Sequence, residues 1–163
     1  MKILHLITSI DRGGAENHLS CLARGQKLQK HDVYIIYLKG NSYWKKYFES
    51  FGIKTINLSK NPKTRSNLFK KILFIRKFIV KKKIEILHSH LPHMELISYL
   101  VLMFFNFKVS YFITKHVDNN FFGGSNYKNY SIFADFINYI VTKKAKQIIC
   151  ISKAVEKYYS NSN

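Results

Sequence analysis

Short apolar runs alternate along the chain with longer segments in which apolar residues recur at helical spacing. Near-continuous apolar runs are typical of β-strands that helices cover on both faces, and the longer pattern is typical of amphipathic helices. The runs predict strands at residues 3–8, 33–38, 53–58, 84–88, 109–114 and 147–151. The longer segments predict helices at residues 15–29, 42–51, 65–82, 93–105, 129–144 and after Ser152.

The repeated order of strand, helix and strand predicts the fold class. It indicates an α/β protein, a single doubly wound Rossmann-like domain with a mostly parallel sheet of about six strands flanked by helices. The expected strand order is 3-2-1-4-5-6. We assign residues 1–157 to this domain and expect residues 158–163 to form a polar tail or the beginning of an interdomain linker.

The composition indicates a folded, cytoplasmic protein. Hydrophobic residues make up 47% of the chain and aromatic residues 15%, which excludes disorder as the overall state. The first residues carry too little positive charge for a signal peptide, and residues 96–105 are about half of the roughly 20 apolar residues that a membrane span needs. Cys21 and Cys150 are far apart, so they predict neither a zinc site nor a disulfide, and we expect both in the core.

The chain is strongly basic, with a net charge of +18 from 27 Lys and Arg residues against 9 Asp and Glu residues. Such an excess favours anionic partners, namely nucleotide phosphates, nucleic acid or an acidic membrane surface. The alternative is that a biased composition simply places solvated lysines on the surface.

Basic residues concentrate at residues 60–83, where ten Lys and Arg residues occur without an acidic one. In the predicted helix of this segment an apolar stripe faces the sheet, and Lys70, Lys77 and Lys81 cluster on the opposite face. Phe74 falls among them, and a basic face with an embedded aromatic residue predicts docking on an anionic membrane. The alternative, that Phe74 packs on a neighbouring helix, stays open.

Two loops follow the strands that flank the expected switch point, where open parallel sheets bind ligands. The first, residues 9–16, contains Gly13 and Gly14 directly before a helix whose free N–H groups suit a phosphate or carboxylate. A glycine pair also fits an ordinary tight turn. The loop contains neither G-x-G-x-x-G nor Gly-Lys-Ser/Thr, so the common dinucleotide and P-loop sites are disfavoured.

The second loop, residues 88–93, is rich in histidine. His88 and His90 share one strand face and His93 follows Pro92, so three imidazoles are close enough in sequence to meet a metal ion. No acidic or cysteine partner accompanies them, and we therefore expect no metal and no cofactor, with the histidines lining a ligand cleft. A structural role for His88 is the alternative.

Another histidine, His116, follows the fifth predicted strand, where its side chain is expected to point into the same crevice. The loop after it contains Phe121 and Phe122. A single histidine at a strand end is often structural, but its position beside the other two loops favours a functional role.

Several segments form a set that spans nearly the whole chain: K-I-L-H-L-I, D-R-G-G-A-E-N-H-L, I-L-H-S-H-L-P, I-T-K-H and I-I-C-I-S-K-A-V. Together they resemble the amino-terminal, acceptor-side domain of family-four-type GT-B glycosyltransferases. One departure is Lys30, because that family usually has glycine before the histidine that follows.

The resemblance implies roles for the residues singled out above. Gly13 and Gly14 are expected to approach the donor diphosphate, and His116 is expected near the reacting sugar as the catalytic residue. The acceptor site is expected to be formed by Glu16, His90, His93, Phe121 and Phe122. The donor would be held mainly by a second domain that this chain does not include, so the chain alone is expected to be inactive.

The activity implied by the resemblance is retaining transfer of a hexosyl group from a nucleotide sugar to a surface-glycan or lipid-linked acceptor, as in bacterial polysaccharide biosynthesis. Catalysis would come from positioning and from stabilising the departing diphosphate. We expect the protein in the cytoplasm, attached peripherally to the inner face of the membrane. The rival is a non-enzymatic basic α/β binding module for nucleic acid or another anionic partner, although no RNP, KH or HTH pattern appears and no specific nucleic acid is expected.

Overall fold

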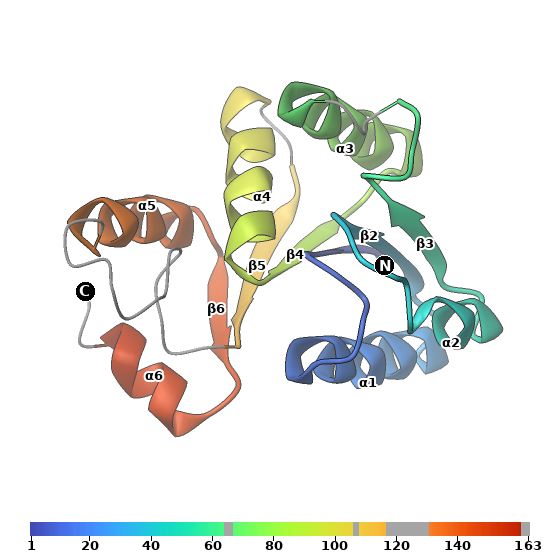
Figure 1. The fold of residues 1–163 in the computed structure, drawn as a ribbon, viewed down its shortest axis with the longest axis horizontal. Helices are drawn as coiled ribbons and strands as arrows, with labels where there is room; N and C mark the ends of the chain where they lie inside the picture. The colour runs from blue at the N-terminus through green and yellow to red at the C-terminus, as the bar shows by residue number, and fades with distance from the viewer. Residues whose placement is uncertain (64–66, 106–107, 117–130, 161–163) are drawn as a thin grey trace.

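The computed structural model describes residues 1–63, 67–105, 108–116 and 131–160. Six parallel strands form one sheet in the order β3-β2-β1-β4-β5-β6 (Figure 1). The strands are β1 (Lys2–Ile7), β2 (Asp32–Tyr37), β3 (Lys54–Asn57), β4 (Ile86–His90), β5 (Ser110–Lys115) and β6 (Gln147–Cys150). The helices are α1 (Gly14–Leu28), α2 (Lys45–Ser50), α3 (Leu68–Lys82), α4 (Pro92–Phe104), α5 (Ser131–Lys143) and α6 (Lys153–Ser160). The predicted fold class and strand order are confirmed.

Helices cover both faces of the sheet, with α1 and α2 on one face and α3 and α4 on the other (Figure 1). The core on the α3 side includes Leu4, Leu6, Ile75 and Val101. The core on the α1 side includes Ile7, Leu19, Ile35 and Phe48. Alternate residues of β1 enter different cores, which explains why both faces of this strand carry apolar residues. No helix within the described parts of the chain is long and apolar enough to span a membrane.

Polar side chains mark where two helices begin. Oδ1 of Asn67 accepts a hydrogen bond from the backbone N–H of Phe69 at 2.6 Å, so α3 begins later than the periodicity alone predicts. Oγ of Ser152 accepts from the backbone N–H of Val155 at 3.3 Å, which confirms the N-cap predicted for the last helix.

The carboxyl-terminal boundary differs from the prediction. α6 continues to Ser160, and Tyr159 is buried. Residues 158–160 therefore belong to the folded domain and not to the tail expected from the sequence.

Three side chains lie in environments other than those predicted. Cys21 is exposed and Cys150 is only half-buried, so the expectation that both lie in the core is wrong. Phe74 is half-buried, stacks on Phe78 with ring centroids 6.4 Å apart and packs against the core. Phe74 is therefore not the exposed aromatic residue that the membrane prediction expects.

Lys30 shows why the resembled family prefers glycine at this position. It follows the end of α1 with a φ of 62°, in the left-handed region that glycine adopts without steric cost. A lysine here carries some backbone strain but leaves the turn into β2 intact.

The first loop is tied to the segment after β2 through one carboxylate. Oδ1 of Asp11 accepts from the backbone N–H of Ser42 at 2.8 Å, and Oδ2 accepts from the N–H of Asn41 at 3.1 Å. Gly40 has a φ of 108°, and a Cβ at this position would overlap Oδ2 of Asp11. Glycine is therefore required at position 40 for both steric and conformational reasons.

We expect Gly40→Ala to lower the free energy of unfolding by roughly 1–3 kcal/mol, because alanine strains the backbone and displaces the Asp11 carboxylate. Urea denaturation followed by circular dichroism measures the change. The matched control is Gly25→Ala, at an exposed position of α1 with open space around a new Cβ. It should raise stability by about 0.5–1 kcal/mol, since alanine is the better helix former. Equal behaviour of the two variants would contradict this account of Gly40.

Candidate functional site

Histidines line the α1-facing side of the three central strands near their carboxyl ends. In the parallel register, His5 of β1 lies beside His88 of β4. Two residues further along β4, His90 lies beside Thr114 of β5. Residues two apart on a strand share a face, so His116, which follows β5, continues this set. Over this region α1 covers imidazoles where a parallel sheet ordinarily presents aliphatic side chains.

The rings form a hydrogen-bonded row with His90 in the middle. Nε2 of His90 is 3.1 Å from Nδ1 of His5, and Nδ1 of His90 is 3.2 Å from Nε2 of His116. The other nitrogen of His5, Nε2, is 2.7 Å from Oε1 of Gln26 in α1. His88 stands beside the row, stacked on His90 with ring centroids 4.4 Å apart.

Burial keeps these imidazoles neutral. His5 and His90 are fully buried, and desolvation lowers the pKa of His5 to about 4 and the pKa of His90 well below its ordinary value. Desolvation also lowers the pKa of His88, helped by repulsion from the neighbouring histidines. The pKa of half-buried His116 falls to about 4 through desolvation and the proximity of His18. At neutral pH these groups therefore act as uncharged hydrogen-bonding partners.

Two buried nitrogen atoms near the end of the row have no hydrogen-bond partner within the part of the chain that the structure describes. They are Nδ1 of His116 and Nδ1 of His18, whose rings meet edge-on with centroids 5.2 Å apart. Ligand nitrogens also lie within 4.8 Å of one another in two sets, His5 with His88 and His90, and His18 with His90 and His116. These two sets are where a transition-metal ion would find three nitrogen ligands.

The glycine loop leads into α1, and Glu16 defines its shape. Gly13 is the N-cap residue of α1, and a Cβ on Gly13 would overlap Oε2 of Glu16. Glu16 is buried and accepts a hydrogen bond from Oγ of Ser9 at 2.5 Å. The carboxyl group thus lies against the backbone that the sequence assigns to phosphate binding, and glycine at position 13 makes room for it.

The sequence-predicted site residues occupy different environments. The exposed ones are Gly13, Gly14 and His93. His116 is half-buried at the same edge of the sheet. His90 requires a correction, because β4 continues to His90 and both of its ring nitrogens are engaged, so it supports His116 and does not line a cleft. Phe121 and Phe122 lie outside the described residues.

Sequence reasoning missed some members of the cluster, namely His5, His18, Gln26 and Thr114. His5 was hidden in an apolar strand, and only its register with His88 reveals it. His18 and Gln26 lie about two helical turns apart on α1, which places them on one face. The predicted strand order places His5 beside His88, and helical spacing places His18 and Gln26 on one side of α1, so both could have been inferred from the sequence.

The opposite face of β5 carries a buried ion pair. Nζ of Lys115 donates to Oε2 of Glu95 in α4 at 2.5 Å and to Oδ1 of Asn138 in α5 at 2.8 Å. It also lies 4.8 Å from the ring centroid of Tyr159 in α6. Burial raises the pKa of Glu95, and Lys115 opposes that shift. Lys115 therefore fastens three helices to the sheet and plays no part in the histidine site.

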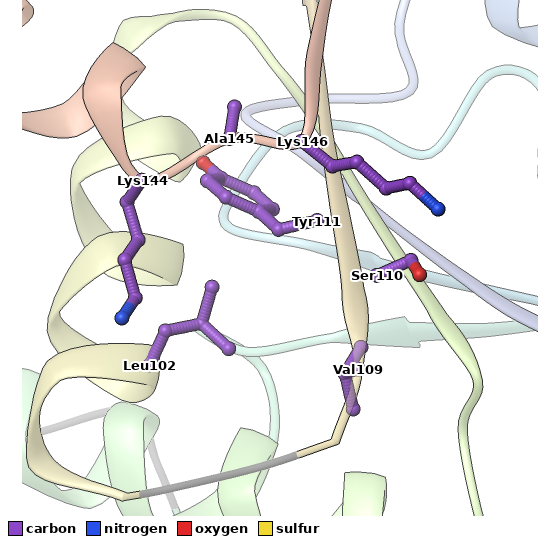
Figure 2. A pocket seen from close by; sticks show the side chains of 7 residues that line it. All are labelled: Leu102, Val109, Ser110, Tyr111, Lys144, Ala145 and Lys146. Atoms are coloured by element: carbon purple, nitrogen blue, oxygen red, sulfur yellow. The ribbon is translucent and has the colours of Figure 1, made fainter.

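A pocket of about 290 Å³ lies near the amino-terminal end of β5, away from the strand ends that carry the histidines. Figure 2 shows Ser110 and Tyr111 at the beginning of β5, Val109 just before it and Leu102 of α4 among the residues that line the pocket. The histidines lie at the carboxyl-terminal ends of the strands, so this pocket is separate from them. Ligands of open parallel sheets bind at the carboxyl-terminal edge, which favours the histidine edge as the functional one.

Comparison with known sequences gives one family. The sequence model described as Glycosyltransferase Family 4 matches residues 12–162. No curated protein matches the chain in sequence.

Several solved structures share the fold. A glycosyltransferase from Rickettsia africae superposes with a TM-score of 0.69 at 20% identity, over 96% of this chain and 38% of its own. The HepE protein of Anabaena in complex with UDP superposes with a TM-score of 0.72 at 12% identity, over 99% of this chain and 41% of its own. Sucrose-phosphate synthase from Thermosynechococcus elongatus superposes with a TM-score of 0.69 at 16% identity, over 99% of this chain and 45% of its own. The chain thus spans less than half the length of these proteins.

The buried histidines predict that the domain loses stability in mild acid. His5, His88 and His90 have lowered pKa values in the folded state, so their contribution is complete above the ordinary value of 6.5 and is lost as the pH falls below it. Three such groups should reduce the free energy of unfolding by about 4 kcal/mol between pH 7.5 and pH 5.5. Urea denaturation at the two pH values measures this loss.

The control for this prediction is His88→Gln, which keeps a polar side chain but cannot titrate. It should reduce the pH-dependent loss by about one third. An unfolding free energy that stays constant from pH 7.5 to pH 5.5 would show that the cluster is not buried in neutral form.

Proposed function

Because the chain belongs to glycosyltransferase family 4, we propose that it is the acceptor-binding half of a retaining hexosyltransferase. The enzyme would move a sugar from a nucleotide sugar to a surface-glycan or lipid-linked acceptor. The observation that carries this proposal is the meeting of His116 with the beginning of α1, where His18 packs edge-on against it. This meeting lies at the carboxyl-terminal edge of the central strands, where such sheets bind ligands.

Because its pKa is lowered to about 4, His116 is uncharged at neutral pH, which limits the groups that it would bind. An uncharged imidazole near a reacting sugar positions hydroxyl groups and does not neutralise a diphosphate. Stabilisation of the departing diphosphate is therefore assigned to backbone N–H groups at Gly13 and Gly14, aided by the dipole of α1. Glu16, held by Ser9, would face the acceptor together with exposed His93.

The donor is assigned mainly to a part of the enzyme beyond this chain. The chain spans 38% to 45% of the three solved proteins compared above. HepE of Anabaena has been solved with UDP and glucose, which supports a nucleotide sugar as the donor class. We propose that the chain alone has no turnover.

The membrane proposal rests on the exposed face of α3. Lys70, Lys77 and Lys81 are exposed, as expected from the helical spacing. Phe74 does not take part because it packs inward, but Phe69 of α3 is 61% exposed and Phe104 of α4 is 60% exposed. Phe69 directly precedes Lys70, and an exposed aromatic residue beside lysines suits the interface of an anionic bilayer, where each lysine contributes about 1 kcal/mol.

His116→Ala tests the catalytic role in a polypeptide that joins this chain to a donor-binding half. We expect kcat to fall about 100-fold or more, because the imidazole would position reacting groups, with a much smaller change in Tm. Steady-state kinetics and thermal unfolding measure the two effects. His31→Ala, at the turn before β2 and outside the cluster, is the control and should retain full kcat. Parallel loss of kcat and Tm would make His116 a structural residue.

Vesicle co-sedimentation tests the membrane proposal with the chain itself. Binding is expected with anionic vesicles and not with neutral ones, and it should be lost at high salt. The triple variant Lys70, Lys77 and Lys81→Glu should stay in the supernatant. The matched control is Lys45→Glu, in α2 on the other face of the sheet, which should bind like the unmodified chain. Equal recovery with both vesicle types would refute the proposal.

A further inference from the structure

The row of imidazoles begins at the side-chain amide of Gln26, which presents its oxygen to the first ring. Oε1 of Gln26 is an amide oxygen, which only accepts hydrogen bonds, and it lies 2.7 Å from Nε2 of His5. With the amide in this orientation, His5 carries its proton on Nε2. A neutral imidazole has one N–H group, so Nδ1 of His5 presents a lone pair to the next ring.

The same reasoning passes along the row. Nδ1 of His5 accepts, so Nε2 of His90, 3.1 Å away, carries the proton that is donated. Nδ1 of His90 is then a lone pair and accepts from Nε2–H of His116 at 3.2 Å. The last lone pair, Nδ1 of His116, is buried and has no partner among the described residues.

We propose that Gln26 is a positioning residue that, through His5 and His90, fixes His116 in its Nε2–H tautomer and leaves Nδ1 as a buried acceptor with no partner among the described residues. This inference rests on the proposed function for its purpose, since His116 is the residue assigned to the reacting sugar. The tautomer itself is a property of this chain and is measured without any turnover.

The three rings change tautomer together or not at all. If one ring flipped alone, two N–H groups or two lone pairs would face each other at 3.1 or 3.2 Å. Such an arrangement loses a hydrogen bond and adds repulsion inside a buried, low-dielectric site. The polarity set at Gln26 is therefore transmitted to His116 without any change in backbone.

The fixed tautomer selects the chemistry of the ligand. A lone pair on Nδ1 of His116 accepts from a hydroxyl or N–H group, and it repels a phosphate oxygen, which is also an acceptor. His116 is thus matched to a sugar hydroxyl and not to the diphosphate of the donor. This assignment separates the sugar-facing side of the site from the glycine loop.

Long-range proton–nitrogen NMR spectra of the chain with labelled histidine test the proposal directly, because they distinguish the two neutral tautomers. We expect His5, His90 and His116 all in the Nε2–H form at pH 7.5. Gln26→Met removes the acceptor, and the Nε2–H share of His116 should fall, since the amide oxygen then no longer orients the row. Gln26→Glu restores an acceptor and should restore the Nε2–H form.

The control is Gln29→Met at the exposed end of α1, which should leave all three tautomers unchanged. If Gln26→Met fails to fold, the spectrum of the unmodified chain decides, because an Nδ1–H form at any of the three rings overturns the proposal. Zinc at equimolar concentration provides a second check. Metal-bound signals at His90 and His116 would identify the cluster as a metal site and would also overturn it.

Discussion

The parallel register of β1, β4 and β5 is the constraint on which the rest of the site depends. It sets His5 beside His88, and His90 beside Thr114, at distances fixed by the spacing of strands. A row of imidazoles on one face requires polar partners from the helix that covers it, and α1 supplies Gln26. Neutral groups that find hydrogen-bond partners are buried at modest cost, so the cluster is compatible with a close-packed interior.

The two faces of β5 carry different polar groups, a buried ion pair on one side and a neutral histidine on the other. Lys115 and His116 are adjacent in sequence but point to opposite sides of the sheet. On one side, the Lys115–Glu95 pair joins α4, α5 and α6 to the strand end, and breaking such a pair leaves an uncompensated buried charge. On the other side, the described contacts of His116 are a hydrogen bond to His90 and an edge-on ring contact with His18. A buried charge pair thus supports the strand end from which the neutral imidazole of His116 projects.

The sequence predicted the architecture because apolar runs and helical stripes have distinct periods, and the strand order followed from the βαβ repeat. It also placed His88 and His90 on one face. It missed the end of β4, because Pro92 begins α4 directly after Leu91 and leaves almost no loop to signal the boundary. It missed His5, since a histidine within an apolar strand gives no local sign of its partners. Phe74 was misjudged because helical spacing alone does not reveal how far the shoulder of α3 is covered by its neighbours.

The strand order also has a consequence for how the chain acquires its structure. β1 lies in the middle of the sheet although it is the first strand to be synthesised, and the contact between His5 and His90 joins residues 85 positions apart. Closing such a long segment costs entropy before any of the contacts are gained, which makes pairings of this kind slow to form. The amino-terminal strand can pair early with β2, but its other edge stays open until β4 has left the ribosome. The imidazole row therefore forms only after β4 and β5 have been made, and until then a nascent chain exposes an unpaired apolar strand edge.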